Sequence, residues 1–196
     1  MASPDDAHRA AHALPGRDVP ERLLSHGRVL IAWADAGTAD PSGRRGVADA
    51  LLAKLVAALG ESGTIGRLCP TCGSTMHGRP VVDAPVALSL GYAGALVAAA
   101  AARTAEAASV GIDIEPDDRE VGDLRALFAP RDAPDLAGWT RIEAVLKADG
   151  RGIRLDPSRV VIEGAQATHP GPFEVATIDG PAGHIISVAV AAPAPR

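Results

Sequence analysis

Apolar residues along the chain follow two kinds of spacing, one typical of helices and one typical of strands. Between residues 46 and 60 they recur every four positions and a glycine follows, which predicts an amphipathic helix. A second pattern of this kind fills residues 134–150 and also ends at a glycine, and a short one covers 123–128. The chain is therefore expected to carry two substantial helices separated by β-structure.

Short runs rich in valine and isoleucine, bounded by turn residues, predict the strands. They cover 28–34, 86–90, 109–115, 159–163, 173–178 and 184–191. The alanine-rich run 95–101 fits a strand that pairs with 86–90 around the turn 91–94, but it also fits a helix, because periodicity does not distinguish the two. This order of strands and helices predicts an α+β fold.

The order of elements is similar in the two parts of the chain, so we expect two similar α+β halves that meet near residues 103–108. Each half is expected to pack a small, mostly antiparallel sheet on a helix. Residues 1–20 are polar and contain prolines, which predicts a flexible leader. The N-terminal half then covers 21–105 and the C-terminal half 106–196.

Composition narrows the range of partners. A net charge of −5 without blocks of like charge argues against a general nucleic-acid-binding surface. The apolar run 93–102 is too short to cross a bilayer, and the first 20 residues lack the basic start and apolar stretch of a secretory signal. The two cysteines cannot build a disulfide framework, which fits a reducing cytoplasm. We expect a monomeric cytoplasmic protein with neither a nucleic-acid nor a membrane partner.

Two acidic residues interrupt the apolar strand at 109–115. Because alternate residues of a strand face the same side, Ile112 and Ile114 are expected to face the core while Asp113 and Glu115 share the other face. Neighbouring carboxylates repel each other and need a cation, a proton or solvent. Taken alone, the strand favours a solvated end at the surface. The alternative is a hard divalent cation such as Mg²⁺, which prefers carboxylate and phosphate oxygens.

A stripe of three residues runs down the helix predicted at 134–150. Trp139, Glu143 and Lys147 are each four positions apart and so lie on one side of that helix. The ordinary interpretation is a weak ion pair between Glu143 and Lys147. The functional interpretation is a third metal carboxylate with a cation one turn away, an arrangement that could hold a phosphate between the metal and the ammonium group.

A turn-rich segment between the predicted helix 46–60 and the strand 86–90 carries both cysteines. Cys69 and Cys72 have the spacing of zinc ligands and His77 follows. A structural zinc site needs four ligands, and the sequence has no second cluster of cysteine and histidine. We therefore favour a turn-rich loop, in which Arg79 is a fixed cation beside a proline.

Taken together, these motifs resemble a known family. The strand GIDIE at 111–115, followed by WTRIEAVLKADGRG at 139–152, is similar to the paired acidic motifs of the 4′-phosphopantetheinyl transferases of the surfactin-synthetase-activating type. The loop CPTCG…HGRPVV also resembles the segment before the central hairpin of that family. The resemblance implies a pseudo-dimer of two α+β halves. It also implies an enzyme that moves the phosphopantetheine arm of coenzyme A onto a serine of an apo acyl or peptidyl carrier protein, in secondary metabolism such as polyketide or nonribosomal-peptide antibiotic synthesis.

The resemblance also assigns roles to individual residues. The Mg²⁺ ligands, which could equally bind Mn²⁺, are Asp113, Glu115 and Glu143. The catalytic residues are Glu143 as general base and Lys147 as the cation that assists the leaving group. The residues expected to contact coenzyme A are Arg44, Arg79, Tyr92, Asp113 and Lys147.

Three positions depart from the family pattern. Tyr92 stands where the family usually has histidine, Gly91 where it has serine, and Ile142 where many members have lysine. The loss of cations at two of these positions motivates an alternative, a degenerate member that binds a carrier domain or coenzyme A without efficient turnover. A third hypothesis is a Mg²⁺-dependent phosphate enzyme unrelated to carrier proteins.

Overall fold

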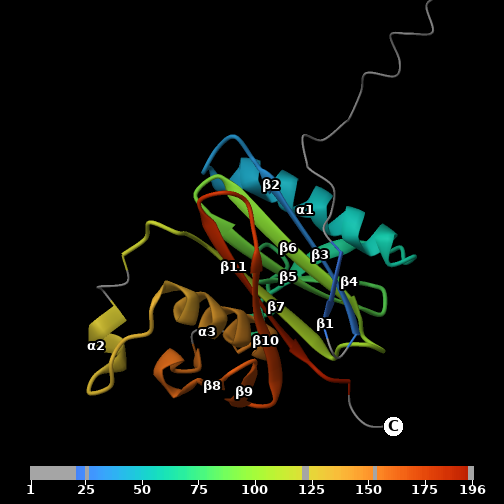
Figure 1. The fold of residues 1–196 in the computed structure, drawn as a ribbon. Helices are drawn as coiled ribbons and strands as arrows, with labels where there is room; N and C mark the ends of the chain where they lie inside the picture. Colours follow the sequence, from blue (N-terminus) through green and yellow to red (C-terminus); the bar gives the residue numbers. More distant parts are fainter. Residues whose placement is uncertain (1–20, 25–26, 121–123, 152–153, 194–196) are drawn as a thin grey trace, which may run out of the picture.

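Two antiparallel sheets form the centre of the protein (Figure 1). The computed structural model describes residues 21–24, 27–120, 124–151 and 154–193. The first sheet has the order β1-β2-β6-β5 and contains β1 (Glu21–Leu24), β2 (Gly27–Asp35), β5 (Val86–Ala93) and β6 (Leu96–Arg103). The second has the order β7-β11-β10-β9-β8 and contains β7 (Ser109–Pro116), β8 (Val161–Glu163), β9 (Gln166–His169), β10 (Phe173–Asp179) and β11 (His184–Ala191). The expected α+β class is confirmed.

A small hairpin and the helices complete the structure. The hairpin pairs β3 (Ile65–Leu68) with β4 (Arg79–Val82). The helices are α1 (Pro41–Ala58), α2 (Arg125–Phe128), α3 (Leu136–Asp149) and a single 3₁₀ turn, η4 (Pro157–Arg159). None of the helices in the described part of the chain is long and apolar enough to cross a membrane.

The helix α1 begins five residues before the position predicted from the apolar pattern. Its first turn contains no large apolar residue, so the periodicity of the sequence could not reveal it. The start is set by Asp40, whose carboxylate accepts hydrogen bonds from the backbone N–H groups of Ser42 and Gly43. Pro41 at the first helical position completes a standard helix N-terminus.

The alanine-rich run forms the strand β6, so the helical alternative is wrong. β6 lies between β2 and β5, and every residue from Val97 to Ala102 is fully buried. A strand buried on both faces shows no alternation of apolar and polar residues, which explains the ambiguity of the sequence. The turn predicted at 91–94 is also displaced. β5 continues to Ala93, and the turn is made by Gly94, with φ of +57°, and Ala95.

The protein is built in the layer order α1, first sheet, second sheet, α3 (Figure 1). On β2, Leu30 and Ala32 pack under α1, whereas Val29 and Ile31 face the second sheet. The core between the sheets also takes alternate alanines of β6, both isoleucines of β7, and Ile186 of β11. The outer face of the second sheet is covered by α3.

The chain passes from the first sheet to the second between Arg103, where β6 ends, and Ser109, where β7 begins. This is the segment in which the sequence predicts the boundary between 21–105 and 106–196, and these bounds stay a prediction. The leader predicted at 1–20 lies outside the described residues. The strands β1, β3, β4 and β9 were not predicted from the sequence. Each has only four residues, which is too short for a clear pattern, and at most one residue in each of β3, β4 and β9 is buried.

Gly111 brings α3 unusually close to β7. A Cβ atom at this position would overlap the carbonyl oxygen of Ala144 and would lie 2.5 Å from the backbone nitrogen of Ala148. Both neighbours are helix backbone, which cannot rotate away as a side chain can. The absence of a side chain at Gly111 therefore sets the distance between α3 and the second sheet.

We expect Gly111→Ala to lower the free energy of unfolding by about 3 kcal/mol, because α3 must move away from its core. Gly66→Ala on β3 is the matched control. Its Cβ would meet only a Val81 methyl group at 3.8 Å, so the change should stay below about 1 kcal/mol. Urea unfolding of both variants measures the difference. Equal destabilisation by the two substitutions would contradict this account.

Candidate functional site

The two acids of β7 are buried. Asp113 is 3% exposed and Glu115 is 9% exposed, so the interpretation of a solvated strand end is wrong. The expected alternation is present, since Ile112 and Ile114 lie in the core between the sheets while the acids face the side covered by α3. Buried carboxylates require a partner that offsets the loss of hydration.

Each of these acids has a basic partner. Nζ of Lys147, on α3, lies 2.6 Å from Oδ1 of Asp113. Arg119, four residues after Glu115 in the chain, donates a hydrogen bond to the carboxylate of Glu115. The second oxygen of Asp113, Oδ2, is buried and has no hydrogen-bond partner among the described residues. An ionised carboxylate with an unsatisfied buried oxygen is one of the features that a bound cation would relieve.

Glu143 lies beside the same acids. Lys147 donates a hydrogen bond to Asp113, so the geometry favours an ion pair between these two residues over the pair of Glu143 with Lys147 that the helix spacing predicted. Burial and then the negative charge of Asp113 raise the pKa of Glu143 to about 7, and Lys147 opposes this effect. Glu115 raises the pKa of Glu143 further. The three carboxylates therefore form one electrostatically coupled group.

The oxygens of these three carboxylates do not all lie within the short mutual distances of a preformed metal site. Asp113, Glu115 and Glu143 are not among the groups of three or more potential metal ligands, within the described residues, whose atoms all lie within 4.8 Å of one another. Glu115 is instead held by Arg119. Oδ2 of Asp113 is the oxygen of this group that is buried without a hydrogen-bond partner among the described residues, and it is therefore free to receive a cation.

A hydroxyl network, buried except for Thr177, lies next to Asp113. Ser187 of β11 is the cross-strand partner of Asp113, and its Oγ lies 2.9 Å from the hydroxyl of Thr140 and 3.1 Å from that of Thr177. These hydroxyls satisfy one another within an otherwise apolar layer. The sequence analysis missed them, although Ser187 stands out as a polar residue within the apolar run 185–191.

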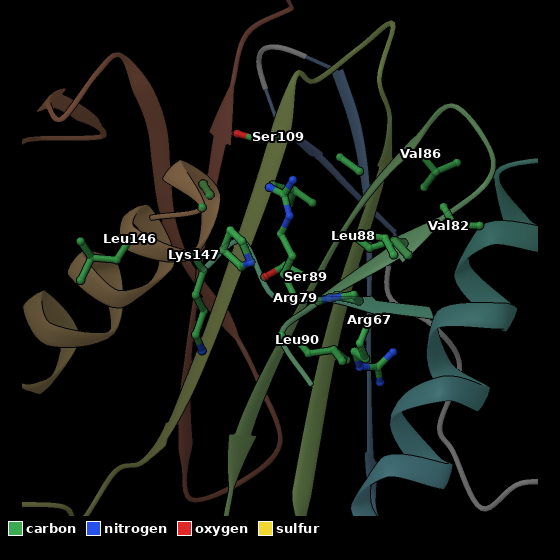
Figure 2. Close-up of a pocket in the computed structure, with 18 of the residues that line it drawn as sticks. Arg67, Arg79, Val82, Val86, Leu88, Ser89, Leu90, Ser109, Leu146 and Lys147 are labelled. Carbon is green, nitrogen blue, oxygen red and sulfur yellow. The ribbon is translucent and has the colours of Figure 1, made fainter. Parts of the chain in front are cut away.

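A cleft of about 500 Å³ lies beside Lys147, which forms part of its lining (Figure 2). One wall is the C-terminal end of α3, and the other is formed by β5 and the β3–β4 hairpin. Figure 2 shows Lys147 on the helix wall and Arg67 on the opposite side. The cations that line the cleft are Arg67, Arg79, Lys147 and Arg151. Four cations around one cleft favour a ligand with several negative charges, such as a phosphate ester.

The cations of the cleft differ in how far their charge is already neutralised. Arg67 lies 2.5 Å from Asp49, and Arg151 lies 2.6 Å from Asp149. No carboxylate among the described residues forms an ion pair with Arg79. The guanidinium group of Arg79 lies close to Gly150, since a Cβ atom on Gly150 would be only 3.1 Å from Nη1 of Arg79. Arg79 is therefore the cation best able to accept a new anion, while Arg67 and Arg151 are residues that the sequence analysis did not single out.

Tyr92 lines the cleft and is 40% exposed. Behind it, the guanidinium group of Arg44 stacks on the ring at 5.1 Å from its centroid and donates a hydrogen bond to the carbonyl of Gly94. Arg44 does not itself line the cleft. Its predicted contact with a ligand stays a prediction, and the contacts present give it the role of holding Tyr92 and the β5–β6 turn.

The two sheets meet at the floor of this cleft. Ser89 of β5 accepts a hydrogen bond of 3.0 Å from the backbone N–H of Ile112 on β7. Two residues later, a Cβ atom on Gly91 would lie 3.3 Å from the Cα of Asp113. The glycine thus allows β5 to pass directly beside the acidic strand, which brings the cleft and the carboxylates together.

Comparison with known proteins gives no assignment, since no protein-family model and no curated protein matches the chain.

We expect Lys147→Met to lower the free energy of unfolding by about 2 to 3 kcal/mol, because it leaves a buried carboxylate without its cation. Adding Asp113→Asn should recover much of this loss, because the unpaired charge is then gone. Urea unfolding with a chelator present measures the coupling, since no metal can then replace the ammonium group. Strictly additive effects would show that the pair does not interact.

The raised pKa of Glu143 predicts a pH dependence of stability. In the folded chain the raised pKa lets Glu143 keep its proton up to about pH 7, whereas the unfolded chain releases it near the ordinary glutamate value of 4.5. Folding therefore takes up a proton between these values, and the stability of the metal-free protein should fall as pH rises through this window. The difference in unfolding free energy between wild type and Glu143→Gln isolates the effect. A difference that is flat, or that grows with pH, would contradict it.

Proposed function

We propose that the protein transfers the 4′-phosphopantetheine arm of coenzyme A to a serine hydroxyl of an acyl or peptidyl carrier protein. The observation that carries this proposal is the position of Lys147, which lines the cationic cleft and also bonds to the buried Asp113. A ligand phosphate beside Lys147 would lie between the cleft and the acidic group. This is the relation that a metal-assisted phosphoryl transfer requires.

A pseudo-dimer of two halves is part of the same proposal. It is supported by the repetition of one arrangement, since each main sheet is antiparallel and carries one long helix on its outer face. The cleft takes residues from both parts, namely β5 and the hairpin from one and α3 from the other. Ligand sites are often found at such junctions.

We propose that Asp113, Glu115 and Glu143 hold a Mg²⁺ or Mn²⁺ ion. The fit is supported by Oδ2 of Asp113, which is buried and has no hydrogen-bond partner among the described residues, and by the pKa of Glu143, which burial and then the negative charge of Asp113 raise. All three ligands are carboxylates, which hard divalent cations prefer. When bound, the ion supplies neutralisation of the charge on the pyrophosphate of coenzyme A.

The side chains supply the remaining chemistry. Lys147 and Arg79 bind and orient the phosphates, and Tyr92 offers a hydroxyl and a ring at the mouth of the cleft. Glu143 takes the proton of the carrier serine hydroxyl while the serine oxygen forms a bond to the β-phosphorus of coenzyme A. The bond from that phosphorus to the bridging oxygen breaks, and 3′,5′-adenosine diphosphate leaves with its new negative charge facing Lys147.

A degenerate protein that binds a carrier domain or coenzyme A without turnover is the second candidate. It was motivated by the absence of cations at positions 92 and 142. Ile142 is buried in the core between α3 and the second sheet and does not line the cleft. The missing lysine at that position therefore removes no charge from the cleft, and the alternative depends on Tyr92 alone.

The proposal predicts a mass increase on a carrier protein. With coenzyme A and Mg²⁺, the wild type should add one phosphopantetheine group to the serine of an apo carrier. Glu143→Gln should lower kcat at least about 100-fold, because it removes the base and one metal ligand. Glu163→Gln, an exposed glutamate on β8, is the matched control and should keep wild-type activity.

Intact-protein mass spectrometry with fatty-acid, polyketide and nonribosomal-peptide carriers follows the product. If no carrier gains mass while calorimetry detects binding of coenzyme A, the non-catalytic alternative is favoured. If neither product nor binding is found, the assignment to coenzyme A is wrong.

Arg79 and Arg151 provide a second test of the cleft. Arg79→Ala should raise the KM for coenzyme A about tenfold with little change in kcat, because it removes a cation that is free to bind a phosphate. Arg151→Ala should change KM less, because Asp149 already neutralises that charge. Steady-state kinetics at fixed carrier concentration measure both values. A larger effect at Arg151 than at Arg79 would show that the ligand lies elsewhere in the cleft.

A further inference from the structure

The loop between β3 and β4 brings together three side chains that the proposed transfer reaction does not use. The thiols of Cys69 and Cys72 and the imidazole of His77 have ligand atoms that all lie within 4.8 Å of one another. Sγ of Cys72 lies 3.6 Å from Nε2 of His77. Within the described residues, this is the one group of three or more cysteine, histidine or acidic side chains that gathers so closely.

The spacing of these atoms fits a tetrahedral ion. Zinc binds sulfur at about 2.3 Å and imidazole nitrogen at about 2.1 Å, so the sulfur and nitrogen of one tetrahedral site lie about 3.6 Å apart. Cys72 and His77 have this separation already. Thiolate and imidazole ligands also select zinc over the magnesium proposed at the carboxylates.

The backbone of the loop is arranged around the Cys69 sulfur. The backbone N–H groups of Cys72 and Thr71 point at this thiol. Gly73, with φ of +72°, turns the chain so that its N–H bonds to the carbonyl of Cys69 at 2.9 Å. Backbone N–H groups directed at a sulfur stabilise the thiolate form that a metal requires.

We propose that Cys69, Cys72 and His77 bind one Zn²⁺ ion, with a water molecule in the fourth position. Cys72 and His77 are exposed, so the fourth position is open to solvent. Zinc sites that keep an open position have three protein ligands and a water molecule, so the lack of a fourth cysteine or histidine in the sequence does not exclude a site of this kind.

The ion would act as a clamp on one wall of the cleft. Pro70, Gly78 and Arg79 belong to or adjoin the loop and line the cleft. At Gly78, with φ of +107°, a Cβ atom would overlap the backbone of Leu68, so the two ends of the loop lie directly against each other. Binding of the ion at the loop therefore fixes the position of Arg79. The metal site itself does not depend on the proposed transfer reaction.

Metal titration of the full-length chain tests the proposal. Reduced, chelator-treated protein is titrated with Zn²⁺ and, in parallel, with Co²⁺, whose spectrum reports its ligands. We expect one tightly bound ion per chain and a thiolate-to-cobalt charge-transfer band that Zn²⁺ abolishes. Cys69→Ser, Cys72→Ser and His77→Ala should each weaken binding at least about 100-fold. His184→Ala, at a histidine outside the loop, should bind as the wild type does.

Circular dichroism of each variant checks that the fold is kept, and hydrogen exchange gives a second measurement on the wild type. Amides of residues 69–78 should exchange more slowly when Zn²⁺ is bound. The proposal is overturned if the reduced protein shows no charge-transfer band, or if the band persists in Cys69→Ser. It is also overturned if freshly isolated protein contains a Cys69–Cys72 disulfide and takes up no metal after reduction.

Discussion

The ion pair between Lys147 and Asp113 connects the parts of the structure on which function depends. Asp113 is buried on β7 and needs a cation, and the nearest one comes from α3, 34 positions later in the chain. The same ammonium group lines the cleft, which also takes residues from the start of β7. One lysine thus couples the acidic group, the position of α3 and the charge of the cleft.

Small residues make this pair possible. Gly111 lets the backbone of α3 approach β7, and Gly91 lets β5 pass beside Asp113. The alanines of β6 fill both faces of a central strand without separating the layers. Large side chains at these positions would push the layers apart and separate the residues of the site. The scarcity of aromatic side chains in this protein fits the close spacing of its layers.

Local patterns in the sequence were enough to predict much of the site. The alternation in 109–115 predicted which residues of β7 face the core, and the four-residue spacing on 134–150 placed Glu143 and Lys147 on one side of α3. What these patterns could not predict depends on contacts between distant segments. The burial of both acids, the choice of Asp113 by Lys147, and the neutralisation of Arg67 by Asp49 are all of this kind. The cysteine loop shows the same limit, since spacing alone could not show that His77 folds back onto Cys72.

In the proposed mechanism, the buried carboxylates and the cationic cleft share one ligand through a divalent ion. Electron paramagnetic resonance of the protein with Mn²⁺ and coenzyme A tests it most directly, because phosphorus nuclei bound to Mn²⁺ give a resolved hyperfine coupling. The account predicts bound Mn²⁺ with phosphorus coupling that appears only with coenzyme A and is lost in Asp113→Asn. Bound Mn²⁺ without phosphorus coupling, or coupling that survives Asp113→Asn, would contradict it.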